Sequence, residues 1–149
     1  MNTTQQNKEV VRQLFEQGLN KRNPDLVKEL VADEFTGPQG KKGGAAFMEP
    51  VLPLIKSFPD IQWNVVDLVG EGDKVLLHWK WQGTQTAPFF TLEATNKTIT
   101  NEGMGVMTLK EGKVINAQVL TDRLGFLQAL EVLPTDIKVL YDKKAHMQH

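Results

Sequence analysis

The sequence predicts a single α+β domain in which helices come first and an antiparallel sheet follows. As far as Phe58, apolar residues recur every three or four positions, which is the period of an amphipathic helix. From Ile61 onward they alternate with polar residues, which is the period of a strand. Short turns such as Gly70-Glu71-Gly72-Asp73 join the alternating segments. The length of 149 residues suits one domain, 1–149, with a core at about 8–133.

Three helical segments are predicted in the first part of the chain. The first carries one apolar stripe, and Thr3 or Thr4 can cap its start. The second is short and begins at Pro24, with Asn23 as its N-cap. The third spans 47–58 and contains two prolines, each of which removes a backbone hydrogen bond. We therefore expect the third helix to be kinked or interrupted.

The second part of the chain contains the strand-like segments. They predict strands at 61–69, 74–82, around 89–92, 98–109 and 114–121. A last helix is predicted from Asp122 to about Leu130. Beyond Tyr141 the chain is polar, and we expect the tail at about 141–149 to be flexible.

The segment 74–82 indicates a partner for the sheet. Alternation places its most apolar residues on one side, namely Val75, Leu77, Trp79 and Trp81. Leu76 and His78 point to the other side, so that side is also partly apolar. Helices on one side and a second subunit on the other would bury both, and we therefore expect a homodimer.

Composition excludes several classes of function. The 17 basic and 18 acidic residues nearly cancel, so no nucleic-acid partner is expected. No apolar run approaches the roughly 20 residues of a membrane span, and the chain starts without a signal-peptide pattern, so we expect no membrane partner and a cytoplasmic location. The chain has no cysteine, and two of its three histidines, His146 and His149, lie in the tail. We expect no metal site and no cofactor.

Asp122 is the strongest candidate for chemistry, because it stands where the last strand meets the last helix. Alternation places Asn116, Gln118, Leu120 and Asp122 on one face. If that face lines a hollow beneath the helices, burial would disfavour the charged carboxylate, as an acid/base group requires. Asp is also a preferred N-cap, and as a cap its carboxylate would stay ionised. Spacing alone leaves both interpretations open.

Other candidates have equally plain structural interpretations. His78 is a possible second proton carrier or an ordinary sheet residue. Trp63, Trp79 and Trp81 could line a pocket for a flat apolar ligand, although core packing or a dimer face is the simpler interpretation. Phe15, Phe47, Met104 and Met107 are interpreted first as core and second as ligand wall.

Several short motifs resemble the SnoaL-like polyketide cyclases, also called ester cyclases, of the nuclear-transport-factor-like superfamily. The resemblance spans about 10–131. It rests on four motifs in the right order, Phe58-Pro59-Asp60, Gly72-Asp73-Lys74-Val75, Gly83-Thr84 and, most specific, Thr121-Asp122-Arg123-Leu124-Gly125. It implies a cone-shaped, mainly antiparallel sheet wrapped around N-terminal helices, with a deep pocket, often in a dimer.

The resemblance also implies a chemistry. In the namesake enzymes an Asp at the position of Asp122 moves a proton during cofactor-free aldol closure of a polyketide ring. This chain departs from the family at Gln85, where a His is frequent, and at Ala117-Gln118, where a His-Trp pair is frequent.

Two functions therefore remain open. The first is a small cofactor-independent cyclase, isomerase or lyase acting on a hydrophobic carbonyl compound. Asp122 and His78 would be catalytic, Asn116 and Gln118 would orient substrate oxygens, and the aromatic residues and Met104 would form walls. The second is a non-catalytic small-molecule-binding or dimerisation module of the same fold.

Overall fold

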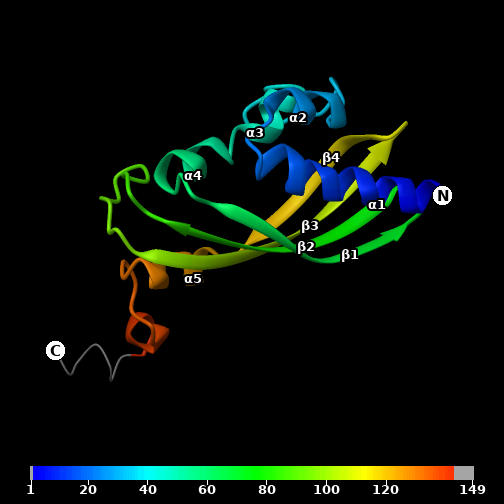
Figure 1. The fold of residues 1–149 in the computed structure, drawn as a ribbon. Coiled ribbons are helices and arrows are strands. Elements are labelled where there is room, and N and C mark those ends of the chain that lie inside the picture. The colour runs from blue at the N-terminus through cyan, green and yellow to red at the C-terminus, as the bar shows by residue number, and fades with distance from the viewer. Residues whose placement is uncertain (1, 143–149) are drawn as a thin grey trace.

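The computed structural model describes residues 2–142 and consists of a curved antiparallel sheet with helices α1 to α4 on one side (Figure 1). This arrangement confirms the predicted α+β class. The expected flexible tail, with His146 and His149, falls almost wholly outside the described residues.

The first helix, α1 (Thr3–Gln13), is capped by a residue that the sequence analysis did not choose. The side-chain oxygen of Asn2 accepts a hydrogen bond from the backbone N–H of Gln5 at 2.8 Å. Neither Thr3 nor Thr4 caps the helix, because both already lie within it. After Gln13 the chain continues directly as a π-helix, η1 (Leu14–Leu19).

The next helices follow the predicted pattern. α2 (Pro24–Leu30) begins as expected, since Asn23 accepts a hydrogen bond from the N–H of Leu26 at 3.2 Å. The proline-containing stripe is interrupted into α3 (Gly44–Met48) and α4 (Leu52–Ser57). No helix in the described part of the chain has both the length and the apolar character to cross a membrane.

The sheet contains four strands in sequence order, each antiparallel to the next. They are β1 (Gln62–Glu71), β2 (Lys74–Thr84), β3 (Thr98–Lys110) and β4 (Lys113–Thr121). The predicted strand around 89–92 is wrong. Phe89 and Leu92 exchange two backbone hydrogen bonds, at 2.8 and 2.9 Å, which makes a tight turn in the connection from β2 to β3.

Both edge strands carry one extra residue. In β1, Val65 and Asp67 have partners on β2, and Val66 between them has none. In β4, Val114 and Asn116 pair with adjacent residues of β3, so Ile115 is the extra residue. A β-bulge of this kind bends the strand and shifts the side-chain alternation by one position. The edge of β4 is also partly covered, because the N–H of Ala32 donates to the carbonyl of Val114 at 2.9 Å.

The core lies between the helices and one face of the sheet, which we call the inner face. The buried residues of β2 project from it, namely Val75, Leu77, Trp79 and Trp81. The π-helix contributes Leu14, Phe15 and Leu19 from the opposite layer. The other side of the sheet, which we call the outer face, carries Leu76 and His78 as predicted.

The last helix, α5 (Arg123–Ala129), closes one end of the core. The ring of Phe126 packs against the rings of Phe58, Trp81 and Phe89, with centroids between 5.3 and 6.2 Å apart. A short 3₁₀ helix, η2 (Ile137–Leu140), follows on the segment that leads away from the sheet (Figure 1).

Candidate functional site

Asp122 lies at the junction of β4 and α5, where the sequence placed it. Its backbone N–H donates to the carbonyl of Glu102 at 3.0 Å, and its own carbonyl accepts from the side-chain amide of Asn101 at 2.9 Å. Its carboxylate oxygen Oδ1 accepts from the backbone N–H of Gly125 at 2.8 Å. The residue is exposed.

This geometry is that of a helix N-cap, one of the two interpretations that the spacing left open. Gly125 is part of the arrangement, because a Cβ atom there would lie only 2.7 Å from Cγ of Asp122. A side chain at this position of α5 would require the carboxylate of Asp122 to shift from its present orientation. The alternative surroundings, an apolar hollow around the carboxylate, are not what the structure provides at this exposed position.

Asn116 and Gln118 lie on the opposite face from the one expected. Gln118 pairs with Val106 and Asn116 with Thr108, so both lie on the outer face, away from the helices. The cause is the bulge at Ile115. Val114 is buried in the core, and simple alternation would have placed Asn116 beside it, but the extra residue reverses the order. Asn116, Gln118 and Leu120 therefore share one face, as alternation predicts, but it is the outer face and does not line a hollow beneath the helices.

His78 lies on the outer face of β2, between two carboxylates. Its Nε2 is 2.9 Å from Oε2 of Glu102, and its Nδ1 is 3.9 Å from Oδ2 of Asp67. Glu102 lies between the two expected proton carriers, since its carbonyl accepts from the N–H of Asp122 and its carboxylate contacts His78. Within residues 2–142, no hydrogen bond joins the side chains of His78 and Asp122 directly. The cluster at His78 is a polar feature of the outer face.

The aromatic candidates belong to the hydrophobic core. Phe15, Phe47, Trp63, Trp79 and Trp81 are all buried. The ring of Phe15 contacts the rings of Trp79 and Phe47, with centroids 5.6 and 6.4 Å apart. These side chains fill the space between the helices and the inner face, which agrees with the simpler of the two interpretations.

The two candidate methionines lie on opposite faces of the sheet. Met107 is buried in the core, whereas Met104 lies on the outer face and is 47% exposed. Met104 pairs with His78 on one side and with Leu120 on the other. The expectation that Met104 belongs to the core is wrong, because its position in β3 alternates with the inward-facing Gly103 and Gly105.

Sequence reasoning missed the structural role of Gln85. Its side chain is completely buried, and its Oε1 accepts from the backbone N–H of Thr95 at 3.1 Å and from the Thr95 hydroxyl at 2.8 Å. Its Nε2 donates to the carbonyl of Leu92 at 3.4 Å. The signal was its position after Gly83-Thr84, where the family often has a histidine. In this chain that position fastens the β2–β3 connection.

Asp60, which belongs to the motif Phe58-Pro59-Asp60 before β1, has a defined hydrogen bond. Its Oδ1 accepts from the backbone N–H of Thr84 at 2.7 Å. This hydrogen bond to the ionised form is the main reason that the pKa of Asp60 is lowered from its ordinary value. The bond ties the start of β1 to the end of β2.

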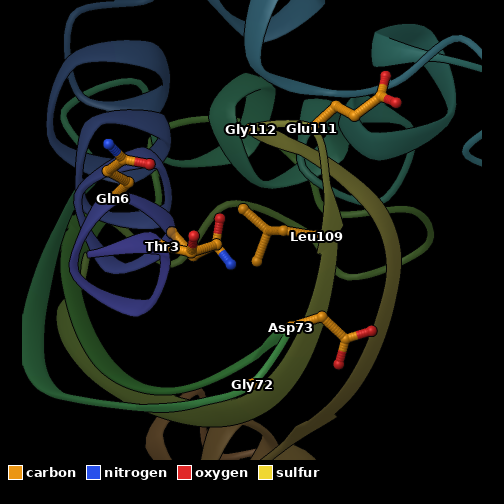
Figure 2. A pocket seen from close by; sticks show the side chains of 8 residues that line it. Thr3, Gln6, Gly72, Asp73, Leu109, Glu111 and Gly112 are labelled. Atoms are coloured by element: carbon orange, nitrogen blue, oxygen red, sulfur yellow. The ribbon is translucent and has the colours of Figure 1, made fainter. Parts of the chain in front are cut away.

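A cavity of about 440 Å³ lies between the start of α1 and the turns at the far ends of the hairpins (Figure 2). Its walls include Thr3, Gln6, Asn7, Gly72, Asp73, Leu109, Glu111 and Gly112. None of these is a residue that the sequence analysis proposed for the site. Within residues 2–142, no three His, Asp or Glu side chains are grouped so that they could hold a metal ion.

Comparison with known proteins gives the family. The model of the SnoaL-like polyketide cyclases matches residues 9–130. The chain belongs to this family, as its motifs suggested. No curated protein matches the chain.

Solved structures agree with the fold. A candidate SnoaL-like polyketide cyclase from Jannaschia sp. CCS1 is 24% identical with a TM-score of 0.77, and the match covers 90% of this chain and 98% of that one. A candidate polyketide cyclase from Acidithiobacillus ferrooxidans is 25% identical with a TM-score of 0.76, covering 89% and 99%. AclR, a candidate hydroxylase from Streptomyces galilaeus, is 17% identical with a TM-score of 0.77, covering 89% and 100%.

Proposed function

We propose that this chain is a homodimeric, non-catalytic module of the SnoaL-like fold, which associates with a second copy through the outer face of its sheet. The observation that supports the proposal is an apolar patch that crosses all four strands. We call it the outer patch, and it consists of Val69, Leu76, Met104, Val106 and Leu120.

The exposure of the outer patch is unusual for a free surface. Leu120 is 82% exposed and Val69 57%, and both belong to strands rather than to loops. Apolar side chains that gather on one exposed face mark a site of interaction. Since the helices already cover the inner face, a partner on the outer face would leave the sheet covered on both sides.

A second copy of the chain is the occupant that fits best. A two-fold interface brings the same patch of each copy together, so the patch must be complementary to itself. The outer patch is apolar, and its neighbouring row carries both signs of charge, with Lys80 paired directly with Glu102. A rotated copy can therefore place acid opposite base at the border of the apolar centre.

The non-catalytic part of the proposal rests on Asp122 and on Trp79. The carboxylate of Asp122 uses Oδ1 to hold the start of α5, and the indole of Trp79 occupies the inner face beside Gly103. The carboxylate of Asp122 therefore does not face an apolar hollow, and the indole of Trp79 fills space on the inner face that a ligand would need.

The oligomeric state tests the first part. Sedimentation of the full chain should give a dimer, and Leu120→Lys should shift it to the monomer, because a charge within the outer patch is costly to bury. Leu52→Lys is the matched control, since Leu52 is 55% exposed and belongs to α4 on the other side of the sheet. A wild-type monomer at micromolar concentration, or equal effects of the two variants, would contradict the proposal.

Acid/base catalysis at Asp122 is the second candidate. It is favoured by the family match, which includes this position, and by Oδ2, which accepts no hydrogen bond among residues 2–142. The reaction would be a cofactor-free aldol-type cyclisation or isomerisation of a small hydrophobic carbonyl compound.

Two variants of Asp122 distinguish the candidates. Asn keeps the capping oxygen but cannot exchange a proton, whereas Ala loses the cap. On our proposal Asp122→Asn is as stable as the wild type, and Asp122→Ala is less stable by about 1 kcal/mol. α-Proton exchange of a cyclic β-diketone in D₂O, followed by NMR, should be equal for wild type and Asp122→Asn. Faster exchange by the wild type would establish the catalytic candidate instead.

A further inference from the structure

Asn7 is a buried polar residue without a protein partner. It lies in the second turn of α1 and is 4% exposed. Its side-chain amide makes no hydrogen bond with any of residues 2–142. A side-chain amide offers two donors and one acceptor, and the amide atoms of Asn7 are not enclosed by protein but remain accessible from the cavity that the residue lines.

The other buried polar side chains form the hydrogen bonds that the side chain of Asn7 lacks. Gln85 bonds to Thr95 and Leu92, the hydroxyl of Ser57 donates to the carbonyl of Pro88 at 2.7 Å, and Asn101 donates to the carbonyl of Asp122. Each of these side chains fastens one part of the chain to another. Asn7 fastens nothing, so its amide is available to a molecule from outside.

The amide of Asn7 lines the cavity of about 440 Å³ at the start of α1. Cavities of this size are within the range that holds small-molecule ligands. The two hairpin turns that face α1 are held together, since the N–H of Leu109 donates to the carbonyl of Asp73 at 2.8 Å. The space beside Gly72 and Gly112 is open, since a Cβ atom at either position would meet nothing within 4 Å, and both glycines have the positive φ that their turns require, 60° and 77°.

The groups around the cavity select the kind of ligand. Thr3, Gln6 and Asn7 offer one hydroxyl and two amides, all from α1, and these groups both donate and accept hydrogen bonds. Figure 2 shows the side chain of Leu109 pointing toward Thr3, whereas the carboxylates of Asp73 and Glu111 point away from it. Among residues 2–142 the lining contains no lysine or arginine, so these residues give an anion no side-chain counter-charge there.

We propose that this cavity binds a small neutral molecule with several hydroxyl groups, a polyol or a monosaccharide, and that the amide of Asn7 is its central contact. Vicinal hydroxyls both donate and accept, which matches the donors and the acceptor of a side-chain amide. The site is separate from the outer patch and from Asp122, so it does not depend on the proposed function.

The test is an NMR titration of the full chain with D-glucose and with glycerol, and with inorganic phosphate as the anion probe. We expect saturable shifts for at least one neutral probe, confined to the Asn7 side-chain amide and to the backbone amides of Thr3, Gln6, Gly72 and Gly112. Phosphate should give none. Bound ligand should also raise Tm in proportion to its occupancy.

Asn7→Leu is the decisive variant, because it keeps the size of the side chain and removes only its hydrogen-bonding groups. It should abolish both the saturable shifts and the ligand-dependent rise in Tm. Thr3→Val is the second variant and should weaken binding severalfold, and Asn64→Leu on the outer face is the control that should leave binding unchanged. Non-saturating shifts with both neutral probes, shifts caused by phosphate alone, or unchanged binding by Asn7→Leu would each overturn the proposal and leave water as the partner of Asn7.

Discussion

The indole of Trp79 lies directly over Gly103 of the neighbouring strand. The two residues are register partners on β2 and β3, and a Cβ atom on Gly103 would be 2.8 Å from Cε2 of the ring. The glycine therefore provides the space that the indole occupies. Gly105, two residues further, gives Trp79 more room, since its Cβ would be 3.5 Å from the ring atom Cζ3.

Gly103→Ala should destabilise the protein by about 1 to 3 kcal/mol, because a methyl group would be forced into a filled core. Gly105→Ala is the matched control on the same strand and face. Its nearest neighbours are a methyl group of Val119 at 3.1 Å and the carbonyl oxygen of Gln118 at 3.3 Å, which is less crowded than the ring beside Gly103, so its cost should be smaller. Urea unfolding followed by tryptophan fluorescence measures both. Equal losses of stability would mean that the indole does not determine the need for Gly103.

Asp60→Asn should lower stability at neutral pH and have little effect in acid. The hydrogen bond from Thr84 lowers the pKa of Asp60 in the folded protein, so the carboxylate stabilises the fold above its unfolded pKa of about 3.9. That stabilisation is lost as the pH falls through the lower pKa of the folded state. The measurement is the free energy of unfolding of wild type and variant between neutral pH and about pH 3. A difference that stays constant over this range would show that the charge of Asp60 plays no part.

Gln85→Leu should loosen the connection between β2 and β3. The substitution leaves the N–H and the hydroxyl of Thr95 without their acceptor, which costs about 1 to 3 kcal/mol for a buried group. Amide hydrogen exchange should accelerate at Thr95 and at Asn96, whose N–H donates to the carbonyl of Gln85. Gln82→Leu, on the exposed outer face of β2, is the control and should change neither stability nor exchange at these positions.

The order and type of the elements could be predicted because they depend on local patterns. The change from helical to alternating apolar spacing marks the start of the sheet, and Asn23-Pro24 marks α2 at the residue level. The cap of α1 could not be chosen correctly, since Asn2, Thr3 and Thr4 all have side chains that can cap. Only the position of the first helical turn distinguishes them.

The candidate site was harder to predict because it depends on which face of each strand meets the helices. One extra residue at Ile115 reverses the side-chain order of β4, and no residue type in that strand announces a bulge. Asn116 and Gln118 were therefore assigned to the wrong side. The unpaired amide of Asn7 was also invisible in the sequence, because it arises where α1 meets two distant turns.

The bulges at Val66 and Ile115 have a consequence for how copies of this chain can assemble. A regular border strand can recruit the border strand of another molecule, and repeated recruitment builds fibres. Here both borders of the sheet are kinked by an inserted residue, and one is also bonded to Ala32. Growth by strand addition is thereby discouraged at both margins, which leaves the broad surface of the sheet as the place for the proposed association of two copies.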